Sequence, residues 1–121
     1  MNINQFHKKY RKITESPSGP EYTRQMVPYI VCKDGFTLSV QASYTHYCSP
    51  REVGADFYDE FEIGFPSEEE HLLMPFCENE EQPTETVYGF VPVKVVDRVL
   101  AKHGGIDEDA TLTRSKQDGM A

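Results

Sequence analysis

The chain has 121 residues, enough for one small domain and too few for two separate cores. Apolar residues make up 38% and aromatic residues 12%, which predicts a folded chain rather than a disordered one. There is no apolar run of about 18 residues and no N-terminal stretch of signal-peptide type. Three cysteines without a CxxC pair argue against a disulfide framework. We therefore expect a cytoplasmic protein with no membrane span.

The formal net charge of -8 is distributed unevenly. Residues 1–25 carry five Lys or Arg against two acids, whereas residues 52–85 carry twelve acids and no Lys or Arg. Like charges at this density repel one another, so the segment needs hydration, a cation or a basic partner. Hydration alone is a sufficient explanation at this point, because acidic solvated faces are common.

The N-terminal residues predict a short basic helix. Its apolar positions, Ile3, Phe6, Tyr10 and Ile13, recur at helical spacing, and Asn2 can cap it. Ser16 to Pro20 form a stretch that ends any helix. We expect residues 1–20 to be a basic helical arm with a linker, outside the central core, which either docks on the domain or swings free.

A hairpin is predicted at the start of a single α+β domain that spans residues 21–105. Runs at 26–32 and 36–43 flank Lys33-Asp34-Gly35. A two-residue loop would pair Lys33 with Phe36, and a three-residue loop with Gly35 in the left-handed position would pair Cys32 with Phe36. We prefer the longer loop, because the shorter one sets a charged side chain beside Phe36.

Residues 57–65 predict a third strand, with Phe61, Ile63 and Phe65 on one side and Glu60 and Glu62 on the other. Residues 66–70 predict the start of a short helix, because Ser67 and Glu70 have capping-box spacing. Residues 77–83 lack periodicity and predict an exposed acidic loop.

The last predicted strand is 86–91, and it leads into the best-defined helix, from Pro92 to His103. Val93, Val96, Val99 and Leu100 form its buried stripe, Lys94, Asp97, Arg98 and Ala101 face water, and Gly104 ends it. Residues 106–121 are expected to be a polar mobile tail. The fold class is α+β: an antiparallel sheet of three or four strands, with this amphipathic helix on one face and the basic N-terminal helical arm.

Reactive side chains offer weak candidates only. His46, Cys48, His71 and Cys77 are ligand types that suit zinc, but their spacing is not that of a usual structural site. Cys48 has His46 as a nearby base and no motif for an orienting group. No phosphate-binding glycine loop occurs. We therefore predict a protein that is not an enzyme and has no cofactor.

The acidic segment carries the preferred hypothesis, in which it imitates a row of phosphates and occupies the basic groove of a nucleic-acid-handling protein. The same charge opposes direct nucleic-acid binding by the domain. On the charge count alone, the partner-binding residues are Asp56, Asp59, Glu60, Glu62, Glu68, Glu69, Glu70, Glu78, Glu80 and Glu81. The alternatives are a small zinc-binding domain, and a structural or assembly protein that forms a homodimer through its N-terminal arm.

Three stretches carry a resemblance: Val31 to Ser43, Tyr47 to Arg51, and Val87 to Val96 with Lys102-His103-Gly104-Gly105. Together they resemble a group of small uncharacterised proteins from bacteriophages and prophages, over roughly residues 27–105. The resemblance carries no catalytic residue. It implies a setting in which small acidic proteins are often inhibitors of host defence, including anti-CRISPR and anti-restriction proteins, in the cytoplasm of an infected bacterium.

Overall fold

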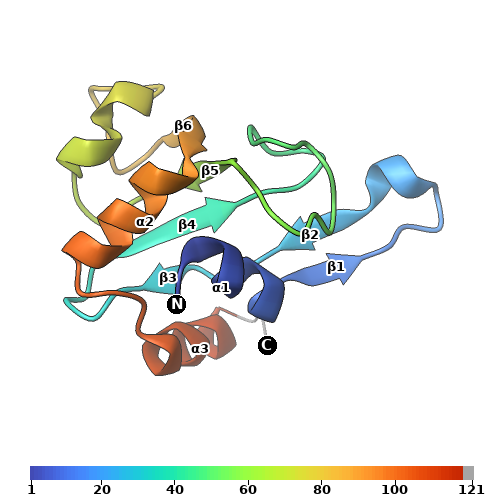
Figure 1. Cartoon of the computed structure of the whole chain (residues 1–121), viewed down its shortest axis with the longest axis horizontal. Coiled ribbons are helices and arrows are strands. Elements are labelled where there is room, and N and C mark those ends of the chain that lie inside the picture. Colours follow the sequence, from blue (N-terminus) through green and yellow to red (C-terminus); the bar gives the residue numbers. More distant parts are fainter. Residues whose placement is uncertain (119–121) are drawn as a thin grey trace.

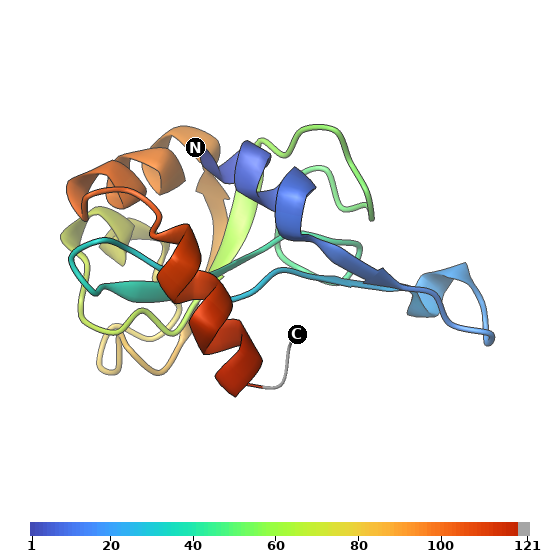
Figure 2. The ribbon, with the colours of Figure 1, turned by 90° about the horizontal axis from the view of Figure 1, so that it is seen from below.

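The centre of the molecule is an antiparallel sheet in the order β3-β4-β5-β6, with β3 at Ile30–Val31, β4 at Thr37–Gln41, β5 at Glu60–Gly64 and β6 at Val87–Pro92 (Figure 1). The computed structural model describes residues 1–118 apart from the side chain of Glu21. Helices α1 (Ile3–Tyr10) and α2 (Val93–Lys102) lie together on one face of the sheet (Figure 2). The predicted α+β class is confirmed.

The predicted hairpin register is also confirmed. Ile30 pairs with Leu38 and Val31 pairs with Thr37, which places Cys32 opposite Phe36. The amide of Cys32 donates to the carbonyl of Phe36 at 2.8 Å, and the intervening loop has Gly35 at a φ of 93°. A three-residue loop needs one left-handed residue, and glycine adopts that conformation without strain.

The run predicted as one strand over 26–32 is divided between two sheets. Its first residue ends β2 (Arg24–Met26), which pairs with β1 (Lys12–Thr14) in a separate two-stranded ribbon. At the break, the side-chain amide of Gln41 binds both the N–H and the carbonyl of Val27, at 3.0 and 2.9 Å. A side chain therefore replaces the missing ladder partners.

The prediction that residues 1–20 form an arm outside the core is wrong. Ile3 and Phe6 are completely buried among the core side chains. Asn2 caps α1 as predicted, and it forms a capping box with Gln5. The apolar stripe of α1 is therefore the face by which it joins the core, and the basic residues remain outside.

The projecting part of the chain is the β1–β2 ribbon instead. The predicted linker lies near its tip, next to the 3₁₀ helix η1 (Pro20–Tyr22), and Figure 2 shows the ribbon extending away from the sheet. A homodimer formed through residues 1–20 stays a prediction. Because α1 packs on the core of its own chain, the part of this segment that projects towards a second copy is the ribbon.

The strand predicted over 57–65 is shorter, and its last apolar residue is misplaced. Phe61 and Ile63 of β5 are fully buried, as expected. Phe65 follows the end of the strand with a φ of 50°, and its ring is 44% exposed. The left-handed conformation interrupts the alternation that placed Phe65 on the inner side.

The predicted helix start at 66–70 is wrong. Ser67 instead extends the pairing of β4, because its amide donates to the carbonyl of Thr37 and its hydroxyl accepts from the amide of Thr37. A 3₁₀ helix, η2 (His71–Phe76), begins only afterwards, and Glu70 is its N-cap. The capping residue is thus the glutamate, three residues later than predicted.

Helix α2 begins directly after Pro92 and ends before Gly104, whose φ is 88°. Its buried residues are Val96, Val99 and Leu100, in agreement with the predicted stripe. Asp97 was expected to face water, but its carboxylate accepts a hydrogen bond from the amide of Ile3 at 2.8 Å. It therefore fastens the start of α1 to α2.

The tail predicted over 106–121 contains a helix, α3 (Glu108–Gln117), so the prediction of mobility is wrong there, and residues 119–121 lie outside the described residues. Asp107 caps α3, and its own amide donates to the carbonyl of Val31 at 2.8 Å. The amide of Val31 in turn donates to the hydroxyl of Thr111. Helix α3 thus covers the outer edge of β3. Within residues 1–118, no helix combines the length and the apolar character needed to cross a bilayer.

Candidate functional site

Two of the ten predicted partner-binding acids are engaged with cations of the same chain. Glu70 is buried, with 2% of its surface exposed, and its carboxylate contacts Lys102 and His103 at 2.9 and 2.7 Å. Its assignment as a partner-binding residue is therefore wrong. Asp56 is exposed but lies 3.4 Å from Lys8, so the basic N-terminal region offsets part of its charge.

The other eight acids form no ion pair with Lys, Arg or His within residues 1–118. They are Asp59, Glu60, Glu62, Glu68, Glu69, Glu78, Glu80 and Glu81. Glu60 and Glu62 are half-buried on β5 and the remaining six are exposed. We call these eight residues the unpaired acids.

The unpaired acids follow the β5–β6 pair from one end to the other. The chain leaves β5 towards Glu68 and Glu69 and enters β6 from the loop that carries Glu78, Glu80 and Glu81. Antiparallel strands place these two connections at the same end of the sheet, and the amide of Phe65 donates to the carbonyl of Thr86 there. The two segments that carry these five acids thus lie at the same end of the sheet, and Figure 2 shows the β1–β2 ribbon extending away from the opposite side. Asp59 and Glu60 lie at the other end of β5, roughly 14 Å away.

Exposed aromatic rings accompany these acids. Phe65 and Phe90 are each 44% exposed, and they are the non-glycine residues with positive φ within residues 1–118. Residues held in such a conformation are strained and occur often at functional sites. Tyr47 is also 44% exposed, and its ring lies 5.9 Å from that of Phe90.

A loop holds this arrangement in place. The carbonyl of Tyr47 accepts from the amide of Phe90 at 3.0 Å, and its amide donates to the carboxylate of Glu62 at 3.3 Å. A Cβ at residue 89 would come within 3.3 Å of the Cβ of Tyr47, so the close approach of the loop favours glycine there. The β-bulge between β5 and β6 occurs at the same place. The sequence pattern did not predict the two exposed Phe rings, although Gly89 beside Phe90 is a signal for a bulge.

The four candidate zinc ligands do not meet. The imidazole of His46 contacts the hydroxyl of Ser43 at 2.6 Å, the thiol of Cys48 is buried, and His71 is exposed. Within residues 1–118, no group of three His, Cys, Asp or Glu side chains is placed to hold a metal ion. Burial also raises the pKa of the Cys48 thiol, which opposes a thiolate nucleophile.

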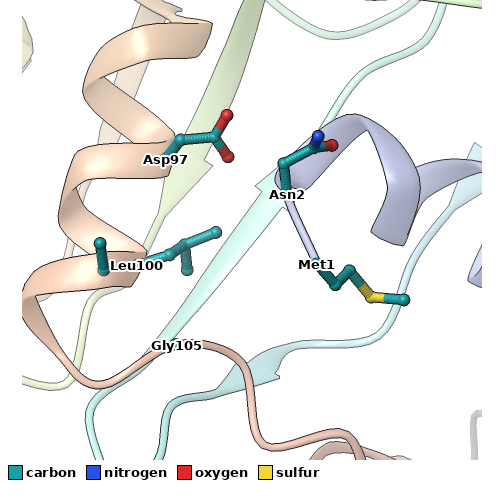
Figure 3. A pocket seen from close by; sticks show the side chains of 6 residues that line it. Met1, Asn2, Asp97, Leu100 and Gly105 are labelled. Carbon is teal, nitrogen blue, oxygen red and sulfur yellow. The ribbon is translucent and has the colours of Figure 1, made fainter.

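A hollow of about 260 Å³ lies between the start of α1 and α2 (Figure 3). Met1, Asn2, Asp97 and Leu100 line it, and the carboxylate of Asp97 points towards Asn2. Ligand pockets are usually larger, at about 300 to 1,000 Å³. The Oδ1 of Asp97 accepts the amide of Ile3, so the hollow lies at the contact between the two helices.

No protein-family model, curated protein or solved structure matches this chain. The surface of the chain itself is therefore the basis of its proposed function.

Proposed function

We propose that this protein is a non-enzymatic inhibitor of the kind that bacteriophages produce. It binds a host defence protein that handles nucleic acid, of the anti-CRISPR or anti-restriction type, in the cytoplasm of the infected bacterium. One observation carries the proposal: within residues 1–118, eight of the ten acids predicted to bind a partner form no ion pair with a Lys, Arg or His side chain.

A basic groove that normally holds nucleic acid supplies the missing cations. Lys and Arg side chains in such a groove are arranged to neutralise a line of phosphates. The carboxylates of β5 and of the connections at its two ends offer negative charge to the same side chains. Charge complementarity of this kind accelerates association and selects the partner. The same negative charge keeps the core domain itself away from nucleic acid.

The exposed rings of Phe65, Phe90 and Tyr47 add a contribution that charge cannot give. Aromatic residues contribute a large share of the binding energy at protein interfaces, whereas exposed carboxylates contribute mainly to rate and specificity. A surface that combines both is better suited to a protein partner than to a bound cation.

Capture of a partner from bacterial lysate, at low and at high salt, tests the proposal. The Debye length falls from about 10 Å at 0.1 M to 3 Å at 1 M, so a partner held by charge is released. In the test variant, four unpaired acids are replaced by Gln: Glu60, Glu62, Glu68 and Glu69. It should lose the partner and keep its circular dichroism spectrum.

A control variant with the same change in net charge separates a located surface from general acidity. It replaces four acids outside the unpaired set with their amides: Glu15, Glu52, Asp109 and Asp118. This control should retain the partner. Equal loss by both variants, or retention by the test variant, rules out the proposed surface.

A further inference from the structure

His103 lies between two carboxylates that come from distant parts of the chain. It follows the last residue of α2 and has only 6% of its surface exposed. One ring nitrogen, Nδ1, contacts Asp34 at 2.6 Å, and the other, Nε2, contacts Glu70 at 2.7 Å. The ring of Phe36 stacks on the imidazole at 3.9 Å between centroids. The histidine thus connects the β3–β4 turn, η2 and α2.

This geometry requires the imidazole to carry two protons. An ionised carboxylate can only accept hydrogen bonds, so each ring nitrogen must donate one. A neutral imidazole has one N–H and one lone pair, and the lone pair would face a carboxylate oxygen. The contacts at 2.6 and 2.7 Å are therefore those of a protonated His103.

The other charged groups around His103 are consistent with this state. The ammonium of Lys102 contacts Glu70 at 2.9 Å, and the buried thiol of Cys32 and the stem of Lys33 lie beside the turn that carries Asp34. Burial alone would lower the pKa of His103, but its hydrogen bonds to Glu70 and Asp34 outweigh burial, and the pKa is raised. Burial likewise raises the pKa of Glu70, but the hydrogen bond from Lys102 and those from the Leu72 amide and His103 outweigh it and the pKa is lowered.

The two carboxylates respond differently when the proton leaves. Glu70 is almost completely buried and accepts the amide of Leu72, so it keeps the remaining N–H of the ring. The side chain of Asp34 is 48% exposed, so water can replace the ring as the partner of its Oδ2 while its Oδ1 keeps the amide of Phe36 at 2.9 Å. Loss of the proton therefore breaks the contact with Asp34 first and leaves Glu70 with less positive charge beside it.

We propose that His103, Asp34 and Glu70 form a pH-operated clasp that fixes η2 against the end of α2 when His103 is protonated and loosens it when the proton is lost. Because η2 lies in the chain between Glu68 and Glu69 on one side and the loop with Glu78 on the other, the clasp also sets the position of the unpaired acids that flank η2. This second step rests on the proposed function; the clasp itself does not.

Titration of the full chain tests the clasp without any partner. Imidazole resonances followed by NMR between pH 5 and 9 should show the titration midpoint of His103 above the ordinary histidine pKa of about 6.5. Amide exchange at Leu72 and Gly35, relative to intrinsic rates, should accelerate as pH rises through the same midpoint. A His103 midpoint at or below the ordinary value, or exchange that does not change at the midpoint, overturns the clasp.

Two variants keep the result interpretable. Asp34→Asn removes the exposed carboxylate, so the His103 midpoint should move down while the buried pair with Glu70 remains. His71→Gln is the matched control and should leave that midpoint unchanged. An unchanged midpoint in Asp34→Asn contradicts the clasp.

Partner capture across the same pH range tests the second step. Capture should weaken as His103 loses its proton in the wild type, and at lower pH in Asp34→Asn. If Asp34→Asn shifts the titration midpoint of His103 in NMR but partner capture does not change with pH, the link between the clasp and the unpaired acids is wrong. If no partner is captured at any pH, the proposed function fails while the clasp stands.

Discussion

Replacement of Phe6 by Ala should remove a large part of the stability of the whole chain. Phe6 has no exposed surface, and its ring lies 5.0 Å from that of Tyr10 within the core that α1 and α2 share. Truncation of a fully buried Phe costs about 3 to 5 kcal/mol. A domain of this length has roughly 6 to 18 kcal/mol of unfolding free energy in total. The midpoint of urea denaturation should therefore fall markedly.

Urea denaturation followed by far-ultraviolet circular dichroism measures this effect, since the chain has no Trp to report by fluorescence. Tyr22→Ala is the control, because Tyr22 is 54% exposed on the ribbon and its loss should cost less than about 0.5 kcal/mol. If Phe6→Ala is as mild as Tyr22→Ala, α1 is a detachable arm and its assignment to the core is wrong.

Three further outcomes follow from single buried or constrained positions. Gln25 bonds two backbone groups and one hydroxyl in the interior, so Gln25→Leu should lower the free energy of unfolding by at least about 2 kcal/mol in urea denaturation. Burial lowers the pKa of His7 to about 4, so protonation of His7 opposes folding. The free energy of unfolding should therefore fall by about 3 kcal/mol as pH drops from about 6.5 to 4, and the variant His7→Gln should not show this pH-dependent fall. Gly104→Ala should lower the melting temperature more than Gly105→Ala does. Both glycines have a positive φ, but only at Gly104 would the new methyl group contact the side chain of Lys33, at 3.2 Å.

The elements predicted correctly are those whose signals are local. Three adjacent residues ending in Gly35 determine the hairpin register, and the apolar spacing of α2 with Gly104 behind it determines that helix. In both cases the turn chemistry and the hydrophobic pattern agree, so no distant contact is needed to decide between alternatives.

The elements predicted wrongly depend on distant partners. Helix α3 has no apolar stripe, and its buried positions are Thr111 and Ser115, so its sequence looks like a solvated tail. It is fixed by hydrogen bonds to Val31, about 80 residues earlier. Phe65 continues the alternation of β5, and only its positive φ shows that the ring is exposed. A periodic pattern cannot reveal such an interruption.

The acidic segment shows why a count of charges overstates a surface. Glu70 stands in a run with Glu68 and Glu69, and the three have the same side chain and the same local sequence. Only Glu70 meets Lys102 and His103, more than thirty residues later, and burial then converts it from a surface charge into a structural one. The end of α2 thus buries Glu70, and through Glu70 it holds η2 in place between the acids on either side. Binding by the unpaired acids that flank η2 therefore depends on the contacts of Glu70 with Lys102 and His103.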